Sequence, residues 1–348
     1  MPVIQFRAMT DSFPYPLLSK VQLISEINRL YRLRIPFLFI INYKADQGYV
    51  IKKEELDENY IQFQFESQHR NAGSHCVEPE IVNAKKKELQ WEINPLSLTD
   101  YQHKFSFVQR QIHLGNSFLV NLTQSTKVQT NLNLLEIYNQ SSARYKVWIK
   151  NSLLVLSPET FVRIDDQIIS SYPMKGTIDA TILFAEEQIL NDPKEMAEHA
   201  TIVDLIRNDL SVVADNVEVK RYRYIETIKT NKQDLLQVSS EITGVLTGHY
   251  RNNPGDTLFA MLPAGSICGA PKAKTLEIIE HAEGYDRNFY SGVCGYFDGQ
   301  NLDSGIMIRF IEQDGENMVF KSGGGITAQS ELIKEYEELI QKIYVPVC

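Results

Sequence analysis

The stretch NSLLVLSPETFVRIDDQIISSYPMKGT, residues 151–177, decides the fold class. Its two apolar runs, NSLLVLS (151–157) and FVRIDDQIIS (161–170), are strand-like and are separated by a short polar segment that contains a proline. A third run of this kind, SGIMIRFIE (304–312), occurs near the C-terminus. Long helical patterns alternate with these runs, so the sequence predicts a mixed α and β architecture.

The end of the same stretch, SYPMKGT (171–177), places a lysine in a turn-like segment rich in Pro, Gly and Thr. Tyr172 and Met174 predict partly buried surroundings for Lys175, where desolvating a charged amine costs several kcal/mol. Taken alone, the motif favours a solvated loop lysine. Other parts of the chain are needed to decide whether Lys175 has a chemical role.

The length and pattern of the chain favour one large fold. With 348 residues and 43% hydrophobic content, the chain could bury one large core or two ordinary ones, but no linker or repeat divides it. We treat residues 1–348 as a single domain with a core region at 100–345 and a less regular N-terminal part at 1–95. In that part a helix-like pattern (19–34) leads into a strand-like run (37–44), and we expect both to lie at the edge of the fold.

The composition excludes several classes of protein. The longest apolar run, IPFLFII (35–41), is too short to cross a bilayer, and the N-terminus lacks the features of a signal peptide, so we expect a cytoplasmic protein. A formal charge of −9 disfavours nucleic acid and anionic membranes as partners, so an anionic substrate would need local cations. The four cysteines form no CxxC pair and are expected to be reduced thiols: Cys76, Cys268, Cys294 and Cys348.

Two segments predict helices that carry paired carboxylates. In PKEMAEHATIVDLIRNDL (193–210), Glu195 and Glu198 share one helical face, which Ile202 and Leu205 continue into the apolar stripe. An acidic, solvated first turn is the simpler interpretation of this pair alone. The segment KEYEELIQK (334–342) repeats the spacing with Glu335 and Glu338, and Lys342 follows Glu338 at i+4. If the helices converge, four carboxylates could coexist around a hard cation such as Mg²⁺.

Glycine-rich segments could supply an anion site. In LPAGSICGAPKAKTLEIIE (262–280) a loop leads into a helix, so amides between Gly265 and Ala270 could point at an anion. The spacing resembles a nucleotide-binding P-loop, but Ala273 replaces its second glycine, which excludes that interpretation. KSGGGIT (321–327) offers close backbone approach or a hairpin turn. Arg309 falls in the strand pattern IMIRF, where a bidentate carboxylate partner is expected.

These motifs together resemble the chorismate-utilising enzymes. Seven of them occur in the order expected for that family, over roughly residues 100–345: LSPETF (156–161), YPMKGT (172–177), EHATIVDLIRNDL (198–210), PAGSICGAPKAKTLEIIE (263–280), YSGVCGYFD (290–298), IMIRF (306–310) and GGGIT with EYEE (323–338). The resemblance implies an α+β fold of two packed, mostly antiparallel sheets with outer helices around a central cleft. It also implies Mg²⁺ as cofactor and chorismate, a dicarboxylate, as substrate.

The same resemblance implies roles for individual residues. Glu198 and Glu338 would hold the metal, with Glu195 and Glu335 beside them. The two substrate carboxylates would be received by a set of polar and glycine residues: Thr177, Gly265, Ser266, Tyr290, Arg309, Gly323, Gly324, Gly325 and Lys342. Lys175 and Glu159 would be the catalytic residues.

Two positions indicate the branch of the family. Branches that add water to chorismate normally carry a lysine base where this chain has Leu119, and an alkyl side chain cannot take a proton. A lysine in PMKGT resembles the aminodeoxychorismate synthases (component I), which make 4-amino-4-deoxychorismate on the way to p-aminobenzoate and folate. In the mechanism that this implies, neutral Lys175 attacks C2 of chorismate while Glu159 protonates the leaving C4 hydroxyl, and ammonia then replaces the lysine by entering at C4.

The chain departs from the family pattern at two positions and lacks its own ammonia source. Cys268 replaces a usual threonine and Leu236 a common histidine, so contacts to substrate oxygens are expected to be rearranged. Neither GVCGY (292–296) nor SICGA (266–270) forms a GxCxG nucleophile elbow, so we expect a separate glutamine amidotransferase subunit to supply ammonia. Two alternatives remain: anthranilate synthase component I, and a non-catalytic scaffold subunit of an amidotransferase complex.

Overall fold

The computed structural model describes residues 13–65, 87–228 and 234–346. The polar stretch 67–75, Cys76 and Cys348 lie outside these residues. Both described cysteines, Cys268 and Cys294, are buried free thiols.

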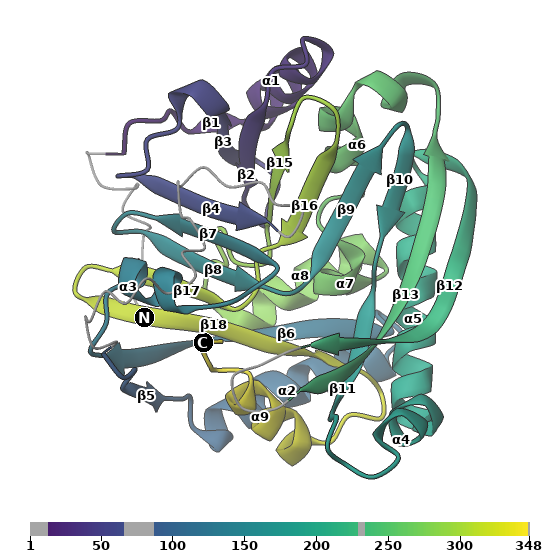
Figure 1. Cartoon of the computed structure of the whole chain (residues 1–348). Helices are drawn as coiled ribbons and strands as arrows, with labels where there is room; N and C mark the ends of the chain where they lie inside the picture. Colours follow the sequence, from purple (N-terminus) through teal and green to yellow (C-terminus); the bar gives the residue numbers. More distant parts are fainter. Residues whose placement is uncertain (1–12, 66–86, 229–233, 347–348) are drawn as a thin grey trace.

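Within the described residues, ten strands form one antiparallel sheet, which stands roughly upright in Figure 1. In spatial order its strands are β1 (Leu18–Ser19), β3 (Gln47–Lys52), β2 (Phe37–Ile41), β15 (Val293–Phe297), β16 (Leu302–Ile306), β9 (Thr160–Asp165), β10 (Ile168–Ser171), β13 (Leu235–Leu246) and β11 (Met174–Asp179), while β12 (Ala214–Ile228) pairs with β13. We call it the first sheet.

A second antiparallel sheet of eight described strands runs across the lower half of the same view. Its order is β14 (Gly269–Ala270), β6 (Leu119–Thr130), β18 (Asn317–Ile326), β17 (Phe310–Asp314), β8 (Leu153–Ser157), β7 (Tyr145–Ile149) and β4 (Ile61–Phe65), while β5 (Trp91–Asn94) pairs with β6. Residues 13–95 therefore add strands to both sheets, and β2 lies inside the first one.

Helices cover the outer faces of the two sheets (Figure 1). The α-helices are α1 (Lys20–Arg32), α2 (Leu98–His113), α3 (Leu134–Gln140), α4 (Ala185–Asn191), α5 (Pro193–Ser211), α6 (Pro254–Met261), α7 (Gly265–Cys268), α8 (Lys272–Glu283) and α9 (Leu332–Gln341), with 3₁₀ turns at Lys53–Glu55 and Gly248–Asn252. The predicted helices at 19–34, 193–210 and 334–342 are confirmed. Helix α5 begins as expected, because Pro193 occupies its first turn and Asp192 accepts a hydrogen bond from the Glu195 amide.

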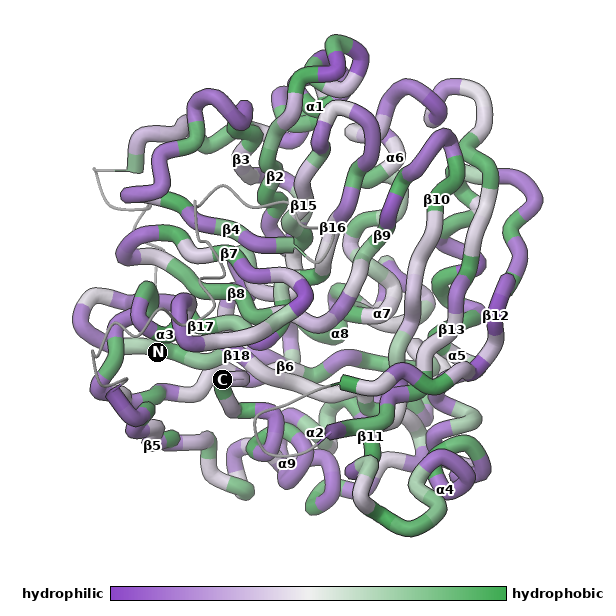
Figure 2. The backbone as a smooth tube through the Cα atoms, viewed as in Figure 1, coloured by the Kyte–Doolittle hydropathy of each residue, from purple (hydrophilic) through white to green (hydrophobic). Residues whose placement is uncertain are grey.

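Strand β2 shows how the core is divided. All five of its residues are apolar (Figure 2), and all five are buried, because the strand is covered on both faces. Phe37, Phe39 and Ile41 join the apolar cluster beneath α1, α5 and α6. Leu38 and Ile40 join a second cluster with Tyr145 and Phe310, which lie in the other sheet. The predicted architecture of two packed antiparallel sheets with outer helices is confirmed.

Two predicted strands are each divided in the structure. The run 161–170 is a hairpin, because Asp166 and Gln167 both have positive φ and turn the chain between β9 and β10. The run 304–312 spans the end of β16, a crossover at Met307–Arg309 and the start of β17, so it changes sheets. Both halves carry buried apolar residues, Ile306 in β16 and Phe310 and Ile311 in β17, and the pattern therefore did not reveal the change of partner.

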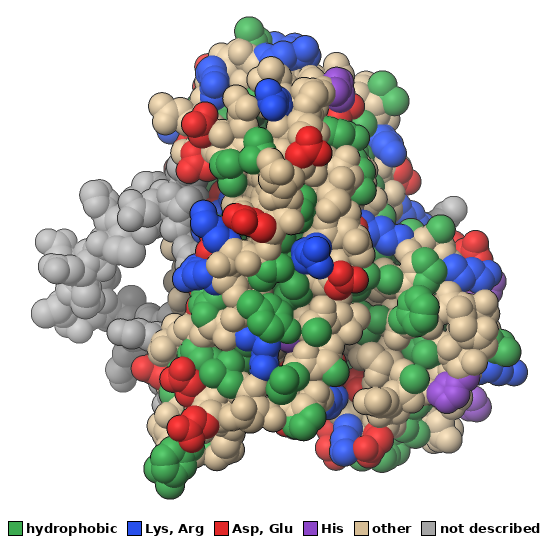
Figure 3. Space-filling model, turned by 90° about the vertical axis from the view of Figure 1, so that its right-hand side faces the viewer, with side chains coloured by type: hydrophobic (Ala, Val, Ile, Leu, Met, Phe, Trp, Pro, Cys, Tyr) green, Lys and Arg blue, Asp and Glu red, His purple; other side chains and the backbone are tan. Residues whose placement is uncertain are grey.

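Two further expectations from the sequence concern membrane-spanning helices and the distribution of charge on the surface. No helix of the described residues is long and apolar enough to cross a membrane. On the face beside β12 and β13, Lys and Arg side chains are interspersed with Asp and Glu side chains (Figure 3). The excess negative charge is not gathered into one acidic patch on that face.

Candidate active site

Lys175 lies on β11 at a bulge in the first sheet. The pairing of β11 with β13 shifts register between Lys175 and Thr177, and Gly176 adopts φ +78° between them. A Cβ atom on Gly176 would lie 3.0 Å from Glu195 Oε2, so the glycine lets α5 approach closely. Lys175 Nζ lies 3.6 Å from Glu198 Oε2, and its side chain is 30% exposed. The lysine is thus half-buried beside a carboxylate, and it lies in a strand rather than a loop, since β11 begins at Met174 after a break at Tyr172 and Pro173.

Glu159 lies where the chain passes from β8 in the second sheet to β9 in the first. Its carbonyl oxygen accepts a hydrogen bond from the Ile306 amide at 3.0 Å, which fixes the crossover. The Ser266 hydroxyl donates to Glu159 Oε1 at 2.9 Å. Burial raises the pKa of Glu159 above its ordinary value, and the hydrogen bond from Ser266 and the charge of Lys175 oppose this shift. The carboxyl is therefore suited to holding a proton.

The predicted carboxylate pairs of α5 and α9 come close enough to influence one another. Burial raises the pKa of Glu335, and the Glu338 and Glu198 carboxylates raise it further. Burial and Glu198 likewise raise the pKa of Glu195. A Cβ atom on Gly324 would lie 3.5 Å from Glu335 Oε2 and 3.7 Å from Glu338 Oε1, so β18 passes directly beneath the α9 pair. The carboxylates of α5 and α9 thus lie near enough for Glu198 to act on the pKa of Glu335.

Lysines neutralise part of this acidic group. Lys342 Nζ lies 2.6 Å from Glu338 Oε1, as the i+4 spacing predicted, and Lys194 Nζ lies 3.7 Å from Glu198 Oε1. Among the described residues no three Asp, Glu, His or Cys side chains lie close enough to hold a metal ion. Four carboxylates are nevertheless the donor chemistry that Mg²⁺ prefers, and burial, together with the neighbouring carboxylates, favours the protonated form of two of them, Glu195 and Glu335. The metal site remains a prediction.

The residues expected to bind the substrate carboxylates differ in how much of each side chain is exposed to solvent. Arg309 adopts φ +51° at the crossover into β17, donates to the Lys342 carbonyl oxygen at 2.7 Å and stacks on Tyr344. The expected strand position of Arg309 is therefore wrong, and within the described residues it has no carboxylate partner. Tyr290 is buried, and burial raises its pKa to about 12, so its hydroxyl stays neutral. Thr177 is exposed on β11.

The two glycine-rich segments are more regular than expected. Gly323, Gly324 and Gly325 pair with Thr123, Leu122 and Asn121 of β6, so they form a strand and not a hairpin turn. The segment 265–270 is a helical turn followed by a short strand, and its amides at Ile267 and Cys268 donate to the Ala264 carbonyl. The Gly265 amide donates to Asp209 Oδ2 at 3.1 Å. The expectation that these amides point at an anion is therefore wrong for Gly265, Ile267 and Cys268.

The two residues that depart from the family pattern lie in different elements, Cys268 in α7 and Leu236 in β13. Burial raises the pKa of the Cys268 thiol to about 11, and its Sγ donates to the Ala264 carbonyl oxygen at 3.2 Å. This cysteine thus faces the backbone of α7. Leu236 pairs with Ile178 on β11, beyond the bulge at Lys175. Leu119 Cδ1 would lie 2.9 Å from a Cβ atom on Gly325, so Leu119 borders the glycine strand.

Sequence patterns missed two buried contacts near this site. Asp209 Oδ1 forms an ion pair with Lys272 Nζ at 2.7 Å, beside its contact with Gly265. His199 Nε2 lies 2.7 Å from Ser240 Oγ, and burial lowers the pKa of His199 to about 4, so the imidazole is neutral. Asp209 continues the helical face of Ile202 and Leu205, and that spacing could have identified it.

Comparisons with known proteins place the chain in a family. The profile of the family described as "chorismate binding enzyme" matches residues 24–347. The chain is 43% identical over 324 residues to an "Uncharacterized PabA-like protein" of Haemophilus influenzae, covering 93% of this chain and 96% of that protein.

More distant relatives have named activities. The chain is 32% identical over 269 residues to aminodeoxychorismate synthase component 1 of Klebsiella aerogenes (73% of this chain, 58% of that protein). It is 35% identical over 280 residues to anthranilate synthase component 1 of Acetivibrio thermocellus (75% of this chain, 54% of that protein). The matched regions thus span little more than half of these two proteins.

Solved structures support the same fold. Anthranilate synthase component I from Streptococcus pneumoniae superposes with a TM-score of 0.70 at 19% identity, covering 97% of this chain and 94% of that chain. At this identity the similarity concerns the fold alone. The profile match and the relatives above 30% identity show more: this chain belongs to the chorismate binding enzyme family.

Proposed function

We propose that this chain is an aminodeoxychorismate synthase component I, which converts chorismate and ammonia into 4-amino-4-deoxychorismate. The observation that carries the proposal is the position of the half-buried Lys175. Its Nζ lies 3.6 Å from Glu198 Oε2, and its charge is near enough to Glu159 to oppose the rise in the pKa of Glu159 that burial causes. A nucleophile, an acid and a set of carboxylates therefore share one region. The 32% identity to an aminodeoxychorismate synthase component 1 agrees with this assignment.

In the first step, the neutral amine of Lys175 bonds to C2 of chorismate while the C4 hydroxyl departs. The leaving hydroxyl takes the proton of Glu159 and is released as water, and the lysine nitrogen returns a proton to the Glu159 carboxylate. The raised pKa of Glu159 favours the protonated form that this step requires. Ser266, which donates to Glu159, orients the carboxyl group.

In the second step, ammonia bonds to C4 through its lone pair and the bond between C2 and the lysine nitrogen breaks. One proton of the incoming ammonia passes to the lysine nitrogen, so that the amine of Lys175 is regenerated. No oxidation or reduction occurs. The carboxylates of the product remain paired with Arg309 and Lys342, whose charges both act on Glu159 and so border the same space.

Mg²⁺ would be held by Glu198 and Glu338, with Glu195 and Glu335 beside them, and would supply positive charge to the ring carboxylate of chorismate. Two lysines of the chain balance part of the negative charge of these carboxylates, because Lys194 lies near Glu198 and Lys342 lies near Glu338. Ammonia would come from a separate glutamine amidotransferase subunit.

Anthranilate synthase component I is the second candidate, because the chain is 35% identical to one such protein. The two activities differ in the carbon that receives nitrogen. Incubating the chain with chorismate, Mg²⁺ and an ammonium salt and identifying the product by mass spectrometry separates them. We expect 4-amino-4-deoxychorismate; anthranilate would support the second candidate, and absence of metal-dependent chorismate binding by calorimetry would support a scaffold role.

A further inference from the structure

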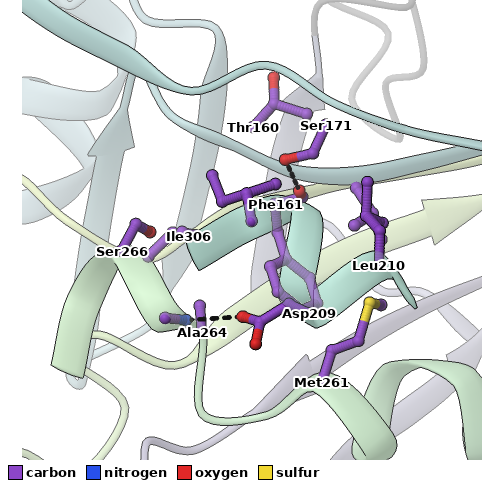
Figure 4. A pocket seen from close by; sticks show the side chains of 12 residues that line it. Thr160, Phe161, Ser171, Asp209, Leu210, Met261, Ala264, Ser266 and Ile306 are labelled. Carbon is purple, nitrogen blue, oxygen red and sulfur yellow. Dashed lines mark hydrogen bonds between the residues drawn. The ribbon is translucent and has the colours of Figure 1, made fainter. Parts of the chain in front are cut away.

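A small cavity is lined by Ser266, the hydrogen-bond partner of Glu159, and by Thr160, which follows Glu159 in the chain (Figure 4). Its walls come from β9, β10, β16, α5, the end of α6 and the start of α7, so it lies between the first sheet and its covering helices. It has room for roughly one water-sized molecule. Neither Lys175 nor any of the four glutamates of α5 and α9 lines it, which separates it from the carboxylate region.

The wall of this cavity is mostly apolar, and the polar side chains in it differ in what they can still bind. Ser171 already donates to the Phe161 carbonyl oxygen at 2.8 Å, and Thr160 is hydrogen-bonded to Tyr145 at 2.9 Å. Asp209 accepts from the Gly265 amide and pairs with Lys272, yet a carboxylate has about four acceptor sites. Ser266 donates its proton to Glu159, which leaves its oxygen able to accept.

We propose that this cavity is the site from which ammonia reaches C4, an inference that rests on the proposed function. Neutral ammonia is the size of a water molecule, donates through three N–H groups and finds acceptors at both Asp209 and Ser266. An apolar wall disfavours the charged ammonium ion, because desolvating an ion costs far more than desolvating the neutral amine.

The position of the cavity also suits the chemistry. Glu159 assists the departure of the hydroxyl from C4, so the carbon that ammonia attacks must lie beside Glu159. The Ser266 hydroxyl is common to the cavity wall and to the Glu159 hydrogen bond. Ammonia bound to Ser266 therefore lies next to C4, the carbon that it attacks, and apart from Lys175, which it replaces.

Ile206 offers a way to fill the cavity without touching the carboxylates. It is a half-buried residue of α5 that lines the cavity and packs against the main apolar cluster. Ile24 on α1 packs against the same cluster to a similar degree but does not line the cavity, which makes Ile24→Phe a matched control. Met261→Phe fills the cavity from another lining residue, on α6, should Ile206→Phe fail to fold.

The test separates the lysine step from the ammonia step. We expect Ile206→Phe to raise the KM for ammonia roughly tenfold, the factor that corresponds to losing about one hydrogen bond. Formation of the chorismate adduct on Lys175, measured without ammonia, should match wild type. Ile24→Phe should leave the KM for ammonia unchanged.

The outcomes are distinguishable. An unchanged KM for ammonia in both filled variants, or an equal rise in Ile24→Phe, would show that the cavity holds water only and would overturn this inference alone. A parallel loss of adduct in the filled variants would assign the cavity to chorismate instead. A wild-type chain that forms no aminated product at all would overturn both this inference and the proposed function.

Discussion

Glu159 and Arg309 lie at two neighbouring points where the chain passes between the sheets. Glu159 joins β8 to β9, and Arg309 joins β16 to β17. The Ile306 amide donates to the Glu159 carbonyl oxygen at 3.0 Å, and the Leu156 amide donates to the Arg309 carbonyl oxygen at 3.1 Å. The crossover from β8 to β9 is thus hydrogen-bonded to the end of β16, and the crossover from β16 to β17 is hydrogen-bonded to β8. These backbone hydrogen bonds place the Glu159 and Arg309 side chains in one region.

Lys175→Ala tests the proposed nucleophile. Wild-type chain incubated with chorismate and Mg²⁺ but no ammonia should gain the mass of chorismate less one water on the peptide that contains Lys175. The alanine variant should lose this adduct and most 4-amination, and residual amination should fall at C2. Lys175→Arg should not restore activity, because arginine stays protonated.

Lys194→Ala is the matched control for that experiment. Lys194 Nζ lies 3.7 Å from Glu198, nearly the same separation as Lys175, but its side chain is 55% exposed. The variant should retain the adduct. Wild-type rates of 4-amination in Lys175→Ala would instead make Lys175 a structural partner of Glu198.

Glu198→Gln and Glu338→Gln should each abolish Mg²⁺-dependent turnover, because each removes a charge from an oxygen-ligand site while nearly preserving its shape. Turnover as a function of Mg²⁺ concentration measures this. Glu337→Gln provides the control, since Glu337 lies on the exposed face of α9. Normal metal dependence in both Glu198→Gln and Glu338→Gln would eliminate the proposed site.

The pH dependence of adduct formation tests Glu159. Since Glu159 must be protonated to release water, the rate should fall as pH rises through its pKa, which burial raises. The Ser266 hydroxyl bonds to the carboxylate and opposes that rise. Ser266→Ala should therefore move the alkaline limb to higher pH, whereas Ser211→Ala on the exposed side of α5 should not. A shift to lower pH would contradict the assignment.

The nitrogen source provides a fourth test. Glutamine alone should not support turnover by the purified chain, because its sequence contains no nucleophile elbow, whereas ammonium salts at raised pH should. Product formation from each nitrogen source is followed by chromatography. Strong glutaminase activity of the chain alone would disprove the need for a partner subunit.

The stability of the fold should depend on the buried pair of Glu283 and Arg287. Both side chains are 1% exposed, and Glu283 also accepts from the Thr123 amide at 2.7 Å. Glu283→Gln leaves the guanidinium uncompensated and should lower the free energy of unfolding by about 3–5 kcal/mol, measured by urea denaturation. The exposed pair of Lys274 and Glu277 serves as control, and Glu277→Gln should have no measurable effect.

The sequence predicted the elements whose local pattern is regular. Helix α5 follows from Pro193, from the apolar stripe of Ile202 and Leu205, and from the polar residues opposite. The family resemblance implies that the α5 and α9 glutamates share one metal site, and in the structure the Glu198 carboxylate is near enough to raise the pKa of Glu335. The motif order also pointed to the family that the profile match shows.

Local patterns could not reveal where the chain changes partners. SGIMIRFIE is mostly apolar on both sides of Arg309, and apolar residues are equally suited to the first sheet and the second, so hydropathy did not show that the chain changes sheets at Arg309. The sequence also did not reveal that amides of segment 265–270 already donate hydrogen bonds within the protein, for a related reason. A glycine-rich segment is compatible with a loop or a helical turn, and only the approach of Asp209 shows which amide is already occupied.

The sequence by itself determined which residues are apolar, which faces of α5 and α9 carry carboxylates, and which side chains can act as acid and nucleophile. Those properties depend on residue type and on spacing along one element. The tertiary structure alone decided that Ser266 meets Glu159, that Asp209 pairs with Lys272 and that Ser266 and Asp209 line one cavity. These contacts join segments more than 50 residues apart, and they depend on how the sheets and helices pack, which no local pattern encodes.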